Sequence, residues 1–325
     1  MHHAVTVSMS RCVVTGAAGF IGSHLSAALL DQGHEVFAVD NFADYYARAA
    51  KERNVGAVRS RKGYQFEEAD LLTADLPAML AGADVVFHEA GQPGVRASWG
   101  TTFEVYCNAN VLVTQRLLEA CRDRPLTRFV YASSSSVYGN AEDLPVVESS
   151  LPRPVSPYGV SKLAGEHLCV LYAAVWGLPT VALRYFTVYG PRQRPDMAFN
   201  KFIRAILTGK EINIFGDGTQ TRDFTYVDDI VAATIAAGLT PGLRPGAVYN
   251  LGGGLRISLN DVISVIAGIA GRAPVVTRAA AQAGDVRDTF ADCTLARADL
   301  GYEPTWSLND GLAAEVDWMR RELVS

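Results

Sequence analysis

The sequence predicts an α/β fold, with a doubly wound parallel sheet followed by a smaller, mixed α/β C-terminal domain. Short β-rich runs alternate with helical segments up to about residue 190, as in successive βαβ units. A glycine-rich turn follows the first of these runs, and a breaker-rich stretch at 190–195 ends the alternation. We therefore expect one domain over residues 1–190, with returns near 228–251, and a second over residues 191–325.

The composition excludes several classes of protein. The 325 residues are 49% hydrophobic and 19% charged, which is typical of a globular chain, and the net charge of -5 gives no basic excess for nucleic acid. The N-terminus lacks the pattern of a signal peptide, and the longest apolar run, 168–183, is broken by Gly177 and Pro179, so we expect no membrane span. Five scattered cysteines indicate a reducing compartment, and the histidines show no metal-ligand spacing. We expect a cytoplasmic protein without a metal.

The first strand, Arg11–Thr15, leads into a turn with three glycines and a helix over 23–30. Such glycines let the backbone turn sharply and approach a pyrophosphate at the helix N-terminus, although an ordinary tight turn fits a glycine triplet too. The second strand, Glu35–Asp40, ends in an acid that would hold the adenosine ribose and repel a 2′-phosphate, so we predict NAD rather than NADP in a Rossmann-type domain. The predicted contacts here are Gly16, Gly19, Phe20, Ile21, Gly22, Asp40 and Asn41.

Two further strands end at the same edge of the predicted sheet. Residues 64–66 form a short strand that leads to Asp70 and Leu71, and the strand at 84–88 is followed by Glu89, Ala90 and Gly91. Ligands of such sheets bind beyond the C-terminal strand ends, so Asp70, Leu71 and Ala90 are predicted cofactor contacts, although loop capping explains them equally well. The polar segment 41–62 is expected to be loop and helix around the adenosine, and a long helix at 102–122 carries Asn110.

A tyrosine and a lysine lie one helical turn apart at Tyr158 and Lys162. That spacing puts the phenol and the ammonium on one helix face, where the positive charge can help the tyrosine act as a base near neutral pH. The strand at 128–132 ends in a run of four serines, 133–136, whose hydroxyls could bond substrate oxygens near that tyrosine. A buried strand at 180–186 then completes the alternation.

The region after residue 190 offers arginines for an anionic substrate. Its segments at 228–238 and 248–251 are expected to return to the first domain. The candidate cations are Arg192, Arg194, Arg222 and Arg287. For any one arginine taken singly, an exposed surface charge is the simpler interpretation.

Together these motifs resemble the extended short-chain dehydrogenase/reductase group that modifies nucleotide sugars, and the match runs over nearly the whole chain. The matching segments are 16–22, 133–139, Tyr158-xxx-Lys162, 184–190 and 216–224. The resemblance implies that Ser134, Tyr158 and Lys162 are catalytic, that Tyr158 and Lys162 also contact NAD, and that Asn110 orients the lysine through a water. It also implies a homodimer through the helices at 102–122 and 158–175.

The resemblance also narrows the reaction. Related 4,6-dehydratases carry an Asp-Glu pair where this chain has Ser135 and Ser136, and uronate decarboxylases carry a glutamate at the second position, so 4-epimerisation remains. Residues 186–197, with 40–42 and 94–96, look most like UDP-glucuronate 4-epimerases. The substrate contacts implied for the UDP-sugar are Arg96, Ser134, Ser135, Ser136, Thr187, Arg192, Arg194, Arg222, Asp285 and Arg287.

Two alternatives stay open at this point. A UDP-glucose or UDP-N-acetylhexosamine 4-epimerase would share every catalytic residue and differ in its sugar pockets. A catalytically idle NAD-binding regulator on the same fold would have no need of Ser134, Tyr158 and Lys162. The sequence departs from the group at Glu89-Ala90-Gly91, where relatives usually show a leucine and two alanines.

Overall fold

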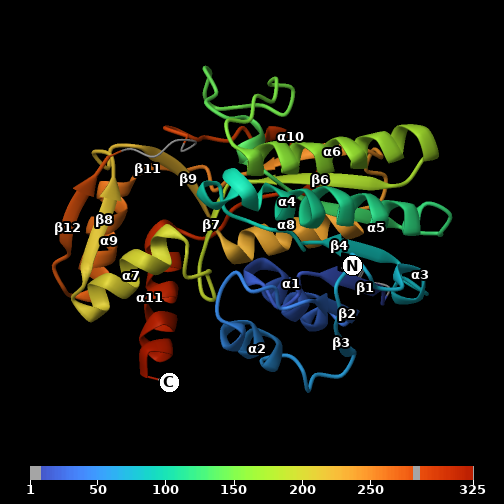
Figure 1. Ribbon diagram of the computed structural model, residues 1–325, viewed down its shortest axis with the longest axis horizontal. Helices are drawn as coiled ribbons and strands as arrows, with labels where there is room; N and C mark the ends of the chain where they lie inside the picture. The colour runs from blue at the N-terminus through green and yellow to red at the C-terminus, as the bar shows by residue number, and fades with distance from the viewer. Residues whose placement is uncertain (1–8, 281–285, 325) are drawn as a thin grey trace, which may run out of the picture.

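A seven-stranded parallel sheet forms the larger part of the molecule (Figure 1). The computed structural model describes residues 9–280 and 286–324. The sheet order is β10-β6-β5-β4-β1-β2-β3, so the chain reverses its direction of travel between β1 and β4. The predicted doubly wound sheet is confirmed, and its ligand crevice is expected at that reversal. The strands are β1 (Arg11–Thr15), β2 (Glu35–Asp40), β3 (Tyr64–Glu68), β4 (Val85–His88), β5 (Arg128–Ser134), β6 (Thr180–Tyr185) and β10 (Ala247–Leu251).

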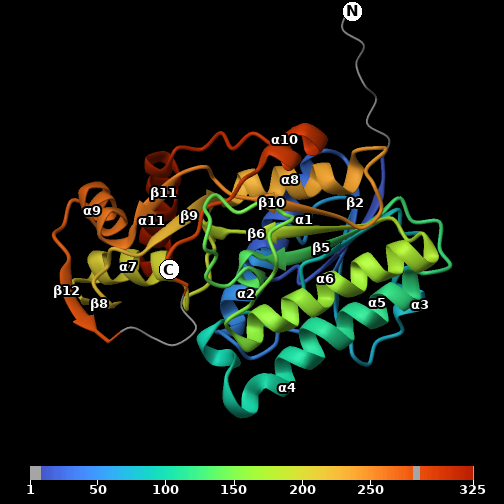
Figure 2. The same ribbon diagram turned by 90° about the horizontal axis from the view of Figure 1, so that it is seen from above.

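Helices cover both faces of this sheet (Figure 2). Alternate strand residues point to opposite faces: Val13 and Phe129 pack with α5 (Val113–Cys121) and α6 (Pro157–Trp176), whereas Val14 and Val130 pack with α1 (Phe20–Asp31) and α8 (Val227–Leu239). The shorter helices α2 (Arg48–Gly56) and α3 (Leu76–Met79) lie near the β2–β4 connections, and α10 (Thr294–Leu300) contacts β10 and α8. Burial on both faces explains why these strands are continuous apolar runs.

The segment predicted as one helix over 102–122 is divided in the structure. Two short 3₁₀ turns (Arg96–Ser98 and Gly100–Thr102) precede α4 (Phe103–Tyr106), and a π-helical segment, Cys107–Leu112, joins α4 to α5. Asn110 lies in this π-helical segment, and its side chain bonds the backbone of Gln92 and the hydroxyl of Ser161. Wider π turns often occur at functional sites, and apolar periodicity does not distinguish them from an α-helix.

The smaller lobe is built from the second half of the chain. It holds a three-stranded sheet, β11-β9-β7, and a parallel pair, β12 with β8. Its elements are β7 (Thr187–Tyr189), β8 (Glu211–Phe215), β9 (Thr221–Tyr226), β11 (Arg256–Ser258), β12 (Val275–Ala279), α7 (Ala198–Thr208), α9 (Leu259–Ala270) and α11 (Leu308–Val324). Helix α8 and strand β10, which come between these elements in sequence, pack with the large sheet instead.

Glu315, on α11, is a fully buried acid within the smaller lobe. One of its oxygens accepts a hydrogen bond from the backbone N–H of Gly190 at 3.0 Å, and the other has no partner. Burial raises the pKa of Glu315 well above its ordinary value. The folded state therefore binds a proton more tightly than the unfolded state, so stability should fall as pH rises from the unfolded pKa, about 4.3, toward the folded one.

Replacing Glu315 by glutamine should remove this pH dependence, because the amide stays neutral and keeps an oxygen for Gly190. Within the window the wild type should lose up to about 1.4 kcal/mol per pH unit relative to the variant. Urea unfolding of both proteins at several pH values between 5 and 8 measures the difference. Asp317→Asn, at an exposed site on the same helix, is the control. A constant difference between wild type and Glu315→Gln would mean that Glu315 is not protonated by folding.

Candidate active site

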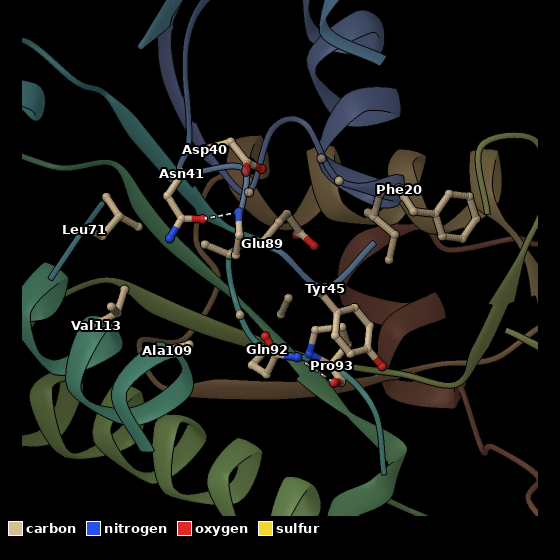
Figure 3. A pocket seen from close by; sticks show the side chains of 18 of the residues that line it. Phe20, Asp40, Asn41, Tyr45, Leu71, Glu89, Gln92, Pro93, Ala109 and Val113 are labelled. Carbon is tan, nitrogen blue, oxygen red and sulfur yellow. Dashed lines mark hydrogen bonds between the residues drawn. The ribbon is translucent and has the colours of Figure 1, made fainter. Parts of the chain in front are cut away.

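A cavity of about 410 Å³ lies along the C-terminal ends of the large sheet's strands (Figure 3). The glycine turn after β1 and the end of β2 line one part of it, and Tyr158 and Lys162 from α6 line another. The loop after β4 and the ends of β5 and β6 complete the wall, with Glu89, Ala90, Ala132, Ser133 and Tyr185. The cavity therefore extends from the acid that ends β2, the adenosine end, to the Tyr158–Lys162 pair, the reaction end.

The glycine turn is packed closely against neighbouring backbone. Gly16 has φ +68°, and a Cβ there would lie 2.7 Å from the backbone nitrogen of Ala90. A Cβ on Gly22 would collide with the carbonyl oxygen of Gly16. Helix α1 begins at Phe20, three residues earlier than predicted, so its N-terminal N–H groups face the cavity at the turn. A pyrophosphate fits this position because those N–H groups and the helix dipole favour an anion.

The adenosine end is held by a buried network around Asp40. Its carboxylate accepts hydrogen bonds from the backbone N–H groups of Ala18 and Phe42, at 3.0 and 2.8 Å. Lys51 donates to the carbonyl of Ala43 at 2.7 Å, and its ammonium lies 4.9 Å from the ring centroid of Tyr46. Burial raises the pKa of Asp40, while Lys51 and the two N–H groups lower it. Asp40 is thus fixed in place at the cavity wall.

The reaction end is formed at the start of α6. Ser156 caps this helix, its hydroxyl accepting from the backbone N–H of Gly159 at 3.1 Å, and Pro157 opens the first turn. Lys162 is buried and donates to the carbonyl of Ala132 in β5 at 2.9 Å. These contacts fix the helix face that carries the phenol and the ammonium against the end of β5.

The titration of these two groups depends on burial first. Burial raises the pKa of Tyr158, while a hydrogen bond with Ser134 and the charge of Arg194 lower it. Burial also lowers the pKa of Lys162 to about 8, against the opposing effect of the Glu89 carboxylate. In this structure the groups that favour the Tyr158 phenolate are therefore Ser134 and Arg194, whereas Lys162 donates to the carbonyl of Ala132.

Asn110 positions the loop after β4 and does not line the cavity itself. Its side-chain oxygen accepts from the Gln92 N–H at 2.7 Å, and its amide donates to the Gln92 carbonyl and the Ser161 hydroxyl. A Cβ on Gly91 would lie 2.8 Å from that oxygen and 3.2 Å from the Lys162 nitrogen. Asn110 therefore connects the 91–92 loop with α6, next to Lys162.

Arg194, on the loop between β7 and α7 of the smaller lobe, brings a positive charge into the cavity wall. It makes a bidentate ion pair with Asp196, at 3.0 and 3.2 Å, and Asp196 also accepts from the Tyr45 hydroxyl at 3.2 Å. Burial would lower the pKa of Arg194, but the ion pair raises it above its ordinary value. A permanent cation therefore faces the same space as Tyr158.

Known proteins share the sequence and the fold of this chain. A family model described as "NAD dependent epimerase/dehydratase family" matches residues 12–252. The chain belongs to this family. The predicted family resemblance is thereby confirmed, and so is the prediction that the protein is an NAD-dependent epimerase.

Three members of this epimerase family illustrate the similarity. A Bacillus subtilis (strain 168) protein named uncharacterized UDP-glucose epimerase YtcB is 46% identical over 310 residues, covering 95% of this chain and 98% of that protein. The UDP-glucuronate 4-epimerase of Thermodesulfobacterium geofontis (strain OPF15) is 35% identical over 319 residues, covering 97% and 98%. The crystal structure of a Bacillus cereus UDP-glucuronic acid 4-epimerase in complex with UDP-glucuronic acid and NAD gives a TM-score of 0.94 at 46% identity, covering 96% of this chain and 99% of that one.

The cavity of this epimerase-family chain fits NAD. The glycine turn can hold the pyrophosphate, and Asp40 can hold the ribose of the adenosine. Family and fit agree, so the prediction of NAD as cofactor is confirmed. All the contacts predicted for it except Asn110 line the cavity, namely Gly16, Gly19, Phe20, Ile21, Gly22, Asp40, Asn41, Asp70, Leu71, Ala90, Tyr158 and Lys162.

The residues predicted to bind the sugar nucleotide are spread more widely. Arg192 is outside the cavity lining and donates to the Ser23 hydroxyl of α1 at 3.4 Å. The Arg96 guanidinium lies 4.2 Å from the ring centroid of Phe215 in β8. Thr187 begins β7 on the segment that leads to Arg194, and Ser135 and Ser136 lie in a 3₁₀ turn (Ser135–Val137).

Arg222 and Arg287 lie together at the edge of the smaller lobe. The Arg222 guanidinium donates to the carbonyls of Thr221 and Arg287, at 2.9 and 2.7 Å, and to that of Val286. The Arg287 side chain is 80% exposed and lies 3.7 Å from Asp288. Asp285, predicted to face the uridine ribose, lies outside the described residues. Arg222 therefore fixes the segment that bears Arg287.

Several cavity residues were missed by the sequence analysis. Tyr46 and Lys51 line the adenosine end, whereas Tyr45 lies nearer the reaction end, where its hydroxyl bonds Asp196 beside Arg194. The aromatic pair at 45–46, shortly after the acid of β2, was an available signal. Val105, Ala109 and Val113 contribute from one side of the α4–α5 region at helical spacing. Among residues 9–280 and 286–324 we find no group of three metal-ligating side chains, and no helix there combines the length and apolarity needed to cross a bilayer.

Proposed function

We propose that this protein interconverts UDP-glucuronate and UDP-galacturonate by NAD-dependent 4-epimerisation. The observation that carries the proposal is the meeting of Tyr158, Lys162 and Arg194 at one end of the cavity. A base suited to the C4 hydroxyl thus lies near a permanent cation suited to the C6 carboxylate. The names of the Thermodesulfobacterium and Bacillus cereus relatives support the same substrate.

In the proposed mechanism, Tyr158 takes the proton of the C4 hydroxyl and later returns it. NAD held by the glycine turn and Asp40 would supply the redox chemistry, taking up the C4 hydride and returning it to the opposite face of the 4-keto sugar. Ser134 bonds the tyrosine oxygen and shares the proton path, and Lys162 adds its positive charge beside the cavity. Nothing is consumed over one cycle, because the proton and the hydride both return to the sugar.

The 4-keto form of a glucuronate is a β-keto acid and can lose carbon dioxide. Loss is fastest when the carboxylate stands perpendicular to the carbonyl plane, so the site must hold it in another orientation. We assign this task to Thr187 and Arg194, since a bidentate arginine fixes both the charge and the plane of a carboxylate. The pairing of Arg194 with Asp196 holds the guanidinium in place for this contact.

Replacing Arg194 by histidine should release carbon dioxide and form a UDP-pentose. We expect kcat/KM for epimerisation to fall roughly 30-fold, the equivalent of about 2 kcal/mol for a lost charge-assisted hydrogen bond. Proton NMR of the nucleotide products measures both outcomes. Arg192→His is the matched control, because Arg192 points to Ser23 of α1, and it should give no pentose. Clean epimerisation by Arg194→His without any pentose would remove the assignment.

A UDP-glucose 4-epimerase is the second candidate, favoured by the name of the Bacillus subtilis relative. The deciding experiment incubates the purified protein, without added cofactor, with UDP-glucuronate and separately with UDP-glucose, and follows products by proton NMR. UDP-galacturonate from the first substrate alone supports the proposal. Conversion of only UDP-glucose would move Thr187 and Arg194 to another role, and conversion of neither, with NAD added, would overturn both candidates.

We further propose a cytoplasmic homodimer. All five cysteines are unpaired thiols, which fits a reducing compartment. The helices expected at the dimer contact carry exposed apolar side chains outside the cavity, among them Leu112, Leu171 and Trp176. A second copy that covered them would remove this surface from water. Light scattering on the purified protein tests the dimer, and a monomer at micromolar concentration would contradict it.

A further inference from the structure

Glu89 is an acid at the reaction end of the cavity that the proposed mechanism does not use. Three carboxyl side chains line the cavity in the described part of the chain. Two of them are at the adenosine end, where Asp40 ends β2 and Asp70 follows β3. Glu89 directly follows β4, between β1 and β5, and Figure 3 shows its side chain among those that line the cavity. Its partial exposure is therefore toward the cavity itself.

The Glu89 carboxylate is held by neighbours from several elements. The Tyr185 hydroxyl, at the end of β6, donates to it at 2.8 Å and also lies 2.9 Å from the Thr234 hydroxyl of α8. The backbone next to Glu89 is fixed as well, since the Ala90 N–H donates to the Thr15 hydroxyl at 3.2 Å. Lys162, from α6, interacts with the carboxylate through charge.

Glu89 contributes the negative charge at the reaction end of the cavity, next to Lys162. Burial raises the pKa of Glu89 to about 7, while the Tyr185 hydrogen bond and the charge of Lys162 lower it. An additional cation in the same dry space would favour the carboxylate further. The oxidised nicotinamide is such a cation, and it must lie near Tyr158, because hydride and proton leave the same C–O–H group of the sugar. Hydride transfer makes the ring neutral, so a fixed carboxylate attracts only the oxidised form.

We propose that the Glu89 carboxylate contacts the nicotinamide end of the bound cofactor and stabilises its oxidised form relative to its reduced form. The inference rests on the proposed function, which it deepens. By favouring the oxidised cofactor, Glu89 favours return of the hydride to the 4-keto sugar. The decarboxylation-prone intermediate is thereby kept scarce, in addition to the orientation that Arg194 provides. Lys162 has the opposite effect on the ring, and Glu89 offsets it.

The test measures which form of the cofactor the protein prefers, without any sugar. The holoenzyme is equilibrated with mixtures of NAD and NADH and desalted rapidly, and the bound ratio is read from the absorbance of NADH. Glu89→Gln should shift this ratio toward NADH on the order of tenfold or more, because a charge interaction near 5 Å is lost at an effective dielectric of about 20. Asp70→Asn, at the adenosine end, should change the affinity for both forms alike and leave the ratio unchanged.

Two further variants separate charge from shape. Glu89→Met should shift the ratio as Glu89→Gln does, because both remove the charge. Tyr185→Phe should shift it in the same direction by a smaller factor, since it removes a hydrogen bond that favours the carboxylate. An unchanged ratio in the Glu89 variants, or in Tyr185→Phe if neither Glu89 variant folds, would overturn the proposal. Because no sugar is present, these outcomes are independent of whether UDP-glucuronate is the substrate.

Discussion

Replacing Tyr158 by phenylalanine is expected to lower kcat for 4-epimerisation by about 10³-fold, within the range for loss of a positioned acid–base group. The ring would still fill its place beside Tyr106, whose centroid lies 6.2 Å away, so the fold and the cavity should persist. Only the phenolic oxygen that bonds Ser134 is removed. Steady-state rates with UDP-glucuronate, together with NAD content and circular dichroism, separate loss of chemistry from loss of structure.

Tyr64→Phe is the matched control for this prediction. Tyr64 is a buried tyrosine of β3 whose hydroxyl has no hydrogen-bond partner, and it lies outside the cavity lining. Its substitution removes the same atom and should leave kcat within a factor of about two, since no acid–base group is lost. If Tyr158→Phe kept more than a tenth of the wild-type rate, another group would have to carry the C4 proton.

Much of the fold was readable from the sequence because its signals are local. Strand β1, the glycine turn and the acid that ends β2 are consecutive, and each is constrained by the backbone or by burial on both sheet faces. The same holds for the spacing of Tyr158 and Lys162 on α6. A parallel sheet then brings these distant segments to one edge without further information.

Other features depend on contacts between distant segments, which periodicity does not contain. The π-helical segment around Asn110 accompanies bonds to Gln92 and Ser161, and the pattern of 102–122 predicts only a continuous helix. Arg192 and Arg194 are two residues apart, yet one points to α1 and the other lines the cavity. The two side chains point in different directions because the backbone turns between β7 and α7, where Arg192 has φ +64°.

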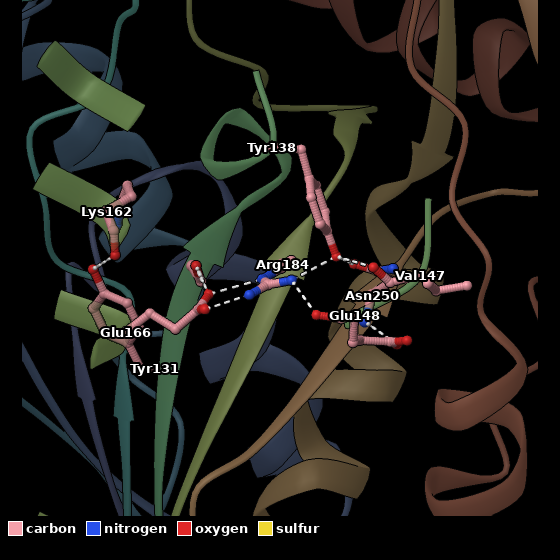
Figure 4. A network of polar contacts seen from close by, with 9 residues as sticks. Tyr131, Tyr138, Val147, Glu148, Lys162, Glu166, Arg184 and Asn250 are labelled. Carbon is pink, nitrogen blue, oxygen red and sulfur yellow. Dashed lines mark hydrogen bonds and ion pairs between the residues drawn. The ribbon is translucent and has the colours of Figure 1, made fainter. Parts of the chain in front are cut away.

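The second large effect is expected from substitutions in a buried polar network that packs against α6 (Figure 4). Glu166, one turn after Lys162 on α6, forms a bidentate ion pair with Arg184 of β6, at 3.0 and 2.6 Å. Both side chains are at most 5% exposed. Ser133 donates to the same carboxylate at 2.7 Å, and Arg184 also donates to the Tyr138 hydroxyl at 2.6 Å. The network thus ties α6, with Tyr158 and Lys162, to the sheet.

Arg184→Met should lower the free energy of unfolding by about 3–5 kcal/mol, because it leaves the Glu166 carboxylate buried without its cation. Urea unfolding measures this loss. The double variant Arg184→Met/Glu166→Gln should be more stable than the single one, since a neutral amide removes the unpaired charge and keeps an acceptor for Ser133. Equal stability of the single and double variants would mean that the charge of Glu166 is not the cause.

An exposed ion pair of similar geometry serves to distinguish the effect of burial on stability from the effect of ion pairing. Arg48 makes two hydrogen bonds to Glu68, at 2.8 and 2.6 Å, but both side chains are about half exposed. Water can solvate either charge alone, so Arg48→Met should cost much less than Arg184→Met. The buried variant should also lose activity together with stability, because α6 carries the tyrosine and the lysine. A folded Arg184→Met protein with a wild-type rate would show that Tyr158 is positioned without this ion pair.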